Sequence, residues 1–242
     1  MSSPRLAVRG ITPAEAEAIV SQERLRPYRD AAGGDSALAV HLYERNIELA
    51  ECTFGALHIL EVCIRNALHR ELSAFAGKQD WYANATIKSS GGLSVPLTAP
   101  MHDTLRQALR NAGPGASSGK IIAELSFGFW TNLLASRFQQ SLWTPSLHRA
   151  FPGFTAHPRK VHRRMEVIQR LRNRIAHHER ILTSQNALRT GHLIEPLIAT
   201  HHILECVNWA DKGAGIWLQS GTRLNRATEI LIELQGSGVL LN

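Results

Sequence analysis

Apolar residues recur at three- and four-residue steps along most of the chain, which is the spacing of one face of an α-helix. The clearest stretch runs from 36 to about 76 and contains no proline and one internal glycine, Gly55. This pattern predicts one helix of up to about 60 Å, or two helices that meet near Gly55. Its apolar positions are Leu49, Cys52, Ala56, Ile59, Leu60, Cys63, Ile64, Ala67, Leu68 and Leu72.

Capping and turn residues mark where other helices begin and end. Thr12-Pro13-Ala14-Glu15 is a capping box with proline at the first helical position, so a short helix is expected from there to about 23. Gly33-Gly34-Asp35 ends one segment and caps the next. Residues 77–100 are rich in glycine and proline and are predicted to form a surface excursion. Further helices are expected at 101–111, at 118–136 with Ser118 as its cap, at 159–182, and as two or three segments within 187–236.

No internal repeat, low-complexity segment or linker interrupts this helical pattern. We therefore predict a single all-α domain over residues 1–242, which is long enough for one sizeable core.

The three cysteines, Cys52, Cys63 and Cys206, are odd in number and widely spaced. They indicate neither a disulfide framework nor a cysteine zinc site, and we expect reduced core residues in a cytosolic protein. The first twenty residues lack the layout of a signal peptide. No uncharged apolar stretch approaches the roughly 18 residues of a membrane span. These observations predict a cytoplasmic protein without a membrane contact.

The net charge of +7 is concentrated in one window. Between His157 and Arg180 stand eight basic and two acidic residues, so this window carries +6 of the +7. A localised basic stripe is typical of a surface that binds a polyanion, and the alternative is a solvated helix face. The basic residues are Arg159, Lys160, Arg163, Arg164, Arg170, Arg172, Arg174 and Arg180.

The stripe ends in the cluster Arg-Asn-Arg-Ile-Ala-His-His-Glu, residues 172–179. Arginine presents a planar fork of donors to phosphate oxygens, and histidine has an unperturbed pKa close to neutral pH. This cluster suits acid–base chemistry on a phosphodiester without a metal. On a helix, Asn173 and His177 share a face, as do Arg174 and His178. Arg172 and His177 are about 140° apart, so the arginine must reach around the helix or meet the histidine of another chain.

An RNA-cleaving mechanism gives each member of this cluster a role. His177 would accept the proton of a ribose 2′-hydroxyl, and Arg172 would stabilise charge on the non-bridging oxygens. Asn173 would hold the histidine or bind a phosphate oxygen, with Glu179 as a further supporting residue. His178, or the His177 of a second subunit in a two-fold dimer, would protonate the leaving 5′-oxygen. Only RNA offers the 2′-hydroxyl.

Four further arginines are the candidate RNA contacts of this hypothesis: Arg163, Arg164, Arg170 and Arg174. The alternative for the whole cluster is a surface helix whose polar residues pair with their neighbours.

A second polar group, Glu61, Arg65, Asn66 and His69, interrupts the apolar stripe of the long helix. Glu61 and Arg65 stand in the favourable acid-before-base order at i and i+4. A buried Glu61–Arg65 pair would orient the basic helix and support the site, whereas an exposed pair would be an ordinary helix salt bridge. The sequence leaves both open and makes none of the four a catalytic residue.

Two other segments are assigned to structure. Residues 123–130 are aromatic-dense at helical spacing, which favours core packing over base stacking. His201 and His202, with Glu205 nearby, match no established ligand spacing. We therefore predict neither a metal nor a cofactor.

Three blocks, in this order, carry a resemblance to a known family: residues 60–66, 125–130 and 171–179. Arg172, four residues and His177 match the Arg-x4-6-His signature of HEPN ribonuclease domains, where Asn often follows the arginine. The surrounding residues resemble the Abi-like (abortive infection) branch of that superfamily. The motif-bearing part is about 36–185, and residues 186–242 would form a helical C-terminal extension.

This resemblance implies an all-α HEPN-like bundle with long central helices and additional C-terminal helices. It also implies a homodimer formed through the motif helices, metal-independent RNA cleavage, and a role in phage defence or as a toxin held by an RNA or protein antitoxin. The residues tied to cleavage carry over to Arg172 and His177. Glu179 stands where some HEPN toxins have a tyrosine that a partner modifies. Two alternatives are a non-catalytic RNA- or nucleotide-binding module and a helical adaptor whose basic stripe docks an acidic antitoxin.

Overall fold

The computed structural model describes residues 11–83, 86–182 and 196–236, and in these the chain is mostly helical. The first helices are α1 (Pro13–Val20), α2 (Gln22–Ala31) and α3 (Ser36–Ala76). A two-stranded sheet of β1 (Thr86–Lys88) and β2 (Ser94–Pro96) precedes α4 (Ala99–Ala112), α5 (Ser118–Glu124) and α6 (Phe127–Leu133). Three short helical segments follow, two of the 3₁₀ type at Ser136–Phe138 and Leu147–Ala150 and one of the π type at Gln139–Trp143. The last helices are α7 (Arg159–Ala176), α9 (Pro196–Ala210), α10 (Lys212–Ser220) and α11 (Thr222–Gly236).

Helix α3 is one continuous helix, the first of the two alternatives that the sequence offered. The Asp35 side chain caps it by accepting a hydrogen bond from the Leu38 amide, and Gly77 ends it in the left-handed conformation. Gly55 does not break the helix. A Cβ at this position would lie 2.5 Å from the Arg223 side chain of α11, so the glycine leaves room for that helix to pass close by.

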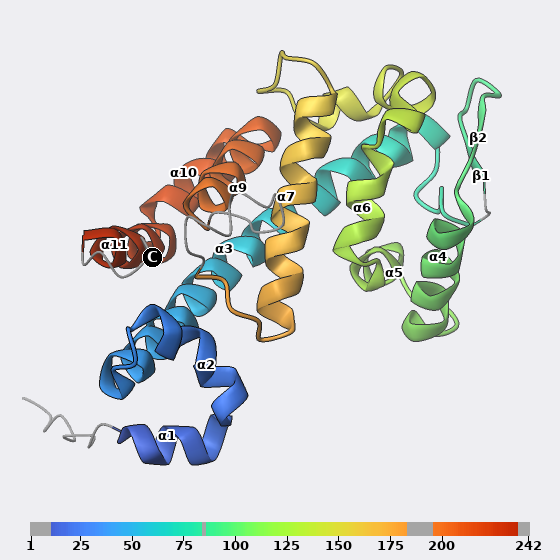
Figure 1. The fold of residues 1–242 in the computed structure, drawn as a ribbon. Helices are drawn as coiled ribbons and strands as arrows, with labels where there is room; N and C mark the ends of the chain where they lie inside the picture. The colour runs from blue at the N-terminus through green and yellow to red at the C-terminus, as the bar shows by residue number, and fades with distance from the viewer. Residues whose placement is uncertain (1–10, 84–85, 183–195, 237–242) are drawn as a thin grey trace, which may run out of the picture.

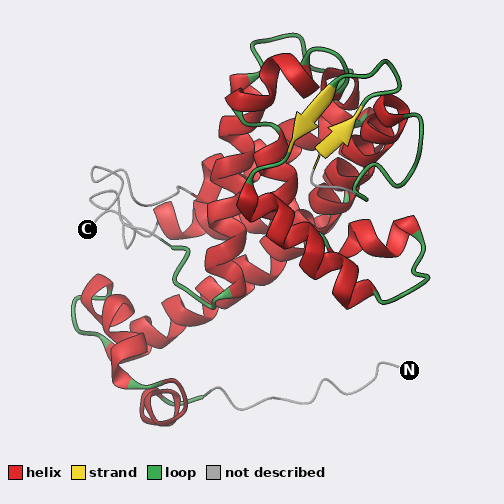
Figure 2. Cartoon of the chain, turned by 90° about the vertical axis from the view of Figure 1, so that its right-hand side faces the viewer, coloured by secondary structure: helices red, strands yellow, loops and turns green. Residues whose placement is uncertain are grey.

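The other elements are arranged around α3 (Figure 1). Helices α1 and α2 lie near its beginning, whereas the β1–β2 hairpin, α4 and α5 lie toward its far end. Helices α9, α10 and α11 cover one side, and α7 crosses the middle. Figure 2 shows the same elongated arrangement from the side, with the N-terminal helices at one extreme and the hairpin at the other.

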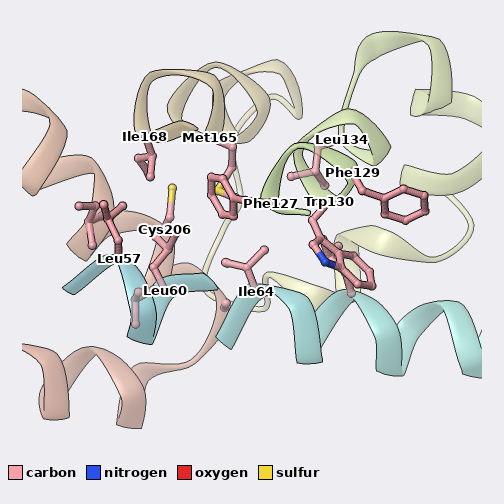
Figure 3. Packing of buried hydrophobic residues seen from close by; sticks show 14 of the residues in the cluster. Leu57, Leu60, Ile64, Phe127, Phe129, Trp130, Leu134, Met165, Ile168 and Cys206 are labelled. Carbon is pink, nitrogen blue, oxygen red and sulfur yellow. The ribbon is translucent and has the colours of Figure 1, made fainter. Parts of the chain in front are cut away.

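Helix α7 packs against α9, α6 and α3. Five residues of α7 at steps of three and four are buried: Val161, Met165, Ile168, Leu171 and Ile175. Figure 3 shows Met165 and Ile168 above Leu60 and Ile64 of α3, with side chains of α6 beside them. This apolar stripe fixes the rotation of α7, and therefore decides which of its polar residues face outward.

The aromatic segment 123–130 belongs to this core, as predicted. Phe127, Phe129 and Trp130 are buried, and Trp130 packs edge-on against Trp81. The three cysteines are free thiols, and Cys206 is fully buried among these apolar residues. Burial raises the pKa of the Cys63 and Cys206 thiols.

Several predicted boundaries were wrong. The β1–β2 hairpin, with Ile87 opposite Val95, occupies part of the predicted surface excursion. The predicted helix 118–136 is divided because Leu125 is extended and Ser126 caps α6 anew, and Ser117 rather than Ser118 caps α5. The predicted N-terminal helix ends at Val20, since Ser21 has a φ of 73°. None of the described helices has an apolar stretch long enough to cross a bilayer.

Candidate functional site at the end of α7

The basic helix α7 ends at Ala176, six residues earlier than the sequence predicted. His177 caps the helix, the His178 amide donates to the Ile175 carbonyl at 3.0 Å, and the Glu179 amide donates to the Arg174 carbonyl at 2.8 Å. These two bonds form a Schellman motif, a common way for a helix to end. His178 and Glu179 therefore lie beyond the helix, and the predicted pairing of Arg174 with His178 on one helical face is wrong.

His178 is in the left-handed conformation, with a φ of 55°. Glycine usually occupies this position, because a Cβ there meets the following carbonyl. The Arg24 side chain of α2 holds the turn by donating a hydrogen bond to the His178 carbonyl at 2.8 Å.

We expect His178→Gly to raise the free energy of unfolding by about 0.5–1 kcal/mol, because glycine adopts the left-handed conformation without strain. Urea unfolding followed by circular dichroism measures this change. His177→Gly is the matched control. His177 has ordinary backbone angles, so glycine there should not stabilise the protein. Equal effects of the two substitutions would show that the left-handed turn at His178 carries no strain.

Arg172 lies on the face of α7 that is directed toward α3. Its Nε is 4.0 Å from Oε2 of Glu61, and both side chains are about one-third exposed. The predicted Glu61–Arg65 pair is wrong, because Arg65 Nε instead donates to the neighbouring Asn66 side chain at 3.4 Å. Glu61 instead faces Arg172 of the basic helix, at the outer limit of distance for an ion pair. Within the described chain Arg172 Nε has no hydrogen-bond partner, since 4.0 Å is too long for one.

A groove of about 710 Å³ opens beside this pair, between α3, α2 and the end of α7. Its α7 side includes Arg172, together with His178 and Glu179 just beyond the helix. On the α3 side, Ile47 and Phe54 are 41% and 51% exposed, which is high for large apolar residues. The groove therefore combines two arginines, two glutamates and an imidazole with an apolar edge. His177 and Asn173 are exposed and do not line this groove.

Asn46 of α3 holds the segment that follows the site. Its side chain is buried, and its Oδ1 accepts hydrogen bonds from the amides of Ile181 at 2.8 Å and Leu182 at 3.1 Å. Arg180 donates a further bond to the Pro27 carbonyl of α2 at 3.5 Å. These contacts fix the path of the chain directly after the groove.

The four arginines predicted to contact RNA fall into two groups. Arg174 donates to the Arg180 carbonyl and lies 3.5 Å from Glu179, and burial lowers its pKa. Arg164 lies 3.1 Å from Glu205 on α9. Arg163 and Arg170 are exposed and form no ion pair with the described residues. Of the four, only Arg163 and Arg170 are fully available to an external anion.

Some residues of the groove were missed from the sequence. Arg24 is 154 residues from the carbonyl that it contacts, so no local spacing could reveal it. Ile47 and Phe54 could have been found from the spacing of apolar residues in the sequence. With Ala50 they form a short apolar stripe on α3, separate from the one that faces the core.

Among the described residues, no group of three or more histidines, cysteines and carboxylates is placed to hold a metal ion. Comparisons with known protein families, with curated proteins and with solved structures found no match to this chain.

Proposed function

We propose that the protein is a metal-independent endoribonuclease of the HEPN type, acting in phage defence or as a toxin. The observation that carries this proposal is the placement of Arg172 and His178 in one groove at the end of a strongly basic helix. Further support comes from the exposure of the imidazoles of His177 and His178, which keeps them accessible to a substrate.

In the proposed reaction, an imidazole removes the proton of a ribose 2′-hydroxyl, and the 2′-oxygen attacks the adjacent phosphorus. The bond to the 5′-oxygen breaks, and a second imidazole gives that oxygen a proton. The products are a 2′,3′-cyclic phosphate and a 5′-hydroxyl. Arg172 stabilises the negative charge on the non-bridging oxygens, and Glu61 limits the positions that its guanidinium adopts.

The proposal includes a homodimer, because one chain leaves His177 outside the groove that holds Arg172. A second copy docked on Ile47 and Phe54 would cover their exposed apolar surface. By two-fold symmetry it would bring the two α7 ends near each other, so that His177 of one chain serves the groove of the other.

The test is incubation of the purified protein with end-labelled RNA in excess EDTA. We expect cleavage that EDTA does not inhibit, with 2′,3′-cyclic phosphate ends. His177→Ala and His178→Ala should each lower the rate by about 10²–10⁴-fold, the usual contribution of a general acid or base. Full activity in both variants would contradict the assignment of the imidazoles, and dependence of the wild type on a divalent cation would contradict the mechanism.

A non-catalytic RNA-binding module is the second candidate. It is favoured by the separation of His177 from the groove, since catalysis needs the arginine and the imidazole at one phosphodiester. In that case labelled RNA binds in a salt-sensitive manner and stays intact in the same assay.

A further inference from the structure

A second hollow, of about 500 Å³, lies at the opposite end of α7, between its first turns and α9. Its rim carries Arg159, Lys160 and Arg163, and His202 of α9 contributes to its lining. This hollow shares no lining residue with the groove that holds Arg172.

The charges on the rim oppose the local stability of the helix. Arg159 and Arg163 are four residues apart, and Lys160 and Arg163 are three apart, so like charges are neighbours on one face. They stand at the amino-terminal end, where the helix dipole is already positive and no acidic residue occupies the first turn. Within the described residues none of these three cations forms an ion pair. A bound anion would relieve all of these repulsions at once.

Beneath the rim lies a buried polar group. His202 is 5% exposed, and its Nε2 accepts a hydrogen bond from Arg164, which places the ring proton on Nδ1. Nδ1 lies 3.4 Å from Glu205 Oε2 and has no hydrogen-bond partner in the described chain. Burial, aided by the Arg164 charge, lowers the pKa of His202 to about 4, so the ring is neutral at pH 7.

Two of the cations around this hollow are held in place. Arg164 is fixed between Glu205, at 3.1 Å, and His202. Lys160 Nζ lies 5.5 Å from the centre of the Trp209 ring, a cation–π contact that limits its movement. Cations that are held in place lose little freedom when they bind an anion. The hollow therefore differs from a solvated helix face, on which each charge moves independently.

We propose that this hollow is a phosphate-binding pocket that takes a backbone phosphate of an RNA strand extending from the groove of Arg172. This proposal rests on the proposed function. Arg163 and Arg172 are nine positions apart on α7, which places them about 14 Å apart along the axis and on opposite sides of the helix. The axial distance alone corresponds to about four base steps of a stacked strand at about 3.4 Å each, and the path around the helix adds to it. An RNA must therefore extend several nucleotides beyond the cleaved linkage to use both sites.

The first measurement is the binding of a fluorescent 12-nucleotide 2′-O-methyl RNA, which has no free 2′-hydroxyl and cannot be cleaved. We expect Arg163→Gln to weaken binding about tenfold, the loss of one charge-assisted phosphate contact, and to reduce the salt slope by about one. The control is Lys88→Gln, which removes one exposed positive charge from β1, far from α7 in Figure 1. If the two variants bind RNA equally well, the proposal that this hollow binds an RNA phosphate is wrong.

Two further substitutions distinguish binding in a preformed pocket from attraction of the RNA by the overall positive charge. Glu205→Gln removes the carboxylate that neutralises the charge of Arg164. We therefore expect this variant to bind the RNA several-fold more tightly than the wild type does. Arg163→Lys keeps the charge and should recover part of the affinity. Thermal unfolding of each variant shows whether its fold is intact. Weaker binding by a folded Glu205→Gln variant contradicts the proposal.

Inorganic phosphate is the second probe, followed by broadening of its ³¹P signal. We expect broadening with the wild type and less with Arg163→Gln. If phosphate binding depends on Arg163 but RNA binding does not, the pocket takes a free phosphate ester and the RNA assignment is overturned. These binding results do not depend on catalysis. Pocket-dependent RNA binding without cleavage of ordinary RNA would reject the proposed enzyme and leave the pocket standing.

Discussion

Arg172→Ala is expected to lower the rate of RNA cleavage by about 10²–10³-fold, the usual effect of removing one group that stabilises transition-state charge. The guanidinium lies in the groove, and its Nε has no hydrogen-bond partner in the described chain, so it has donor capacity left for a phosphate. Single-turnover cleavage of a short labelled RNA measures the rate. Circular dichroism and gel filtration verify that the fold and the oligomeric state are unchanged.

Two further variants distinguish the effect of the charge of Arg172 from the effect of its shape and orientation. Arg172→Lys keeps the charge but loses the planar fork, so we expect most of the activity to be lost with it. Glu61→Gln leaves the arginine present but less well oriented, and its effect should be smaller than that of Arg172→Ala. If Arg172→Ala cleaves RNA at the wild-type rate, the arginine has no part in the reaction, whatever its position.

The second large effect is expected for Asn46→Ala, which should lower the free energy of unfolding by about 2–4 kcal/mol. The side chain accepts hydrogen bonds from two backbone amides, those of Ile181 and Leu182, in a buried position. Each buried amide left without an acceptor costs about 1–3 kcal/mol. Denaturant unfolding of the purified variant measures the loss.

Asn46→Asp is the matched control for this prediction. It keeps an oxygen in the accepting position and replaces the side-chain amide nitrogen by a second oxygen. The negative charge strengthens the two hydrogen bonds but is buried, so we expect a loss of stability that is smaller than for alanine. An alanine variant as stable as the wild type would mean that the amides of Ile181 and Leu182 find another partner, and that Asn46 does not hold this segment.

Features that depend on local sequence were predictable. The capping box at Thr12, the Asp35 cap and the apolar stripe of α3 all appear in the structure, because each rests on residues within one or two turns. The end of α7 was not predictable in this way. No glycine marks it, and the stop at Ala176 comes from a left-handed histidine whose carbonyl is held by Arg24.

The contacts of the candidate site could not be predicted from the sequence. The spacing of Glu61 and Arg65 predicted a pair within α3, yet the packing of α7 across that helix gives Glu61 a partner from α7. In the same way, the predicted histidines are separated by the end of the helix. His178 faces the groove of Arg172, and His177 does not. Tertiary packing decided both outcomes.

Through α2, the first part of the chain contacts the candidate site. Arg24 secures the turn at His178, and the Pro27 carbonyl receives Arg180 a few residues further along. Helix α2 therefore anchors the turn that ends α7, although it lies in a remote stretch of sequence. Whatever shifts α2, whether a binding protein or a proteolytic cut near the beginning of the chain, would alter the position of the His178 imidazole without contacting α7.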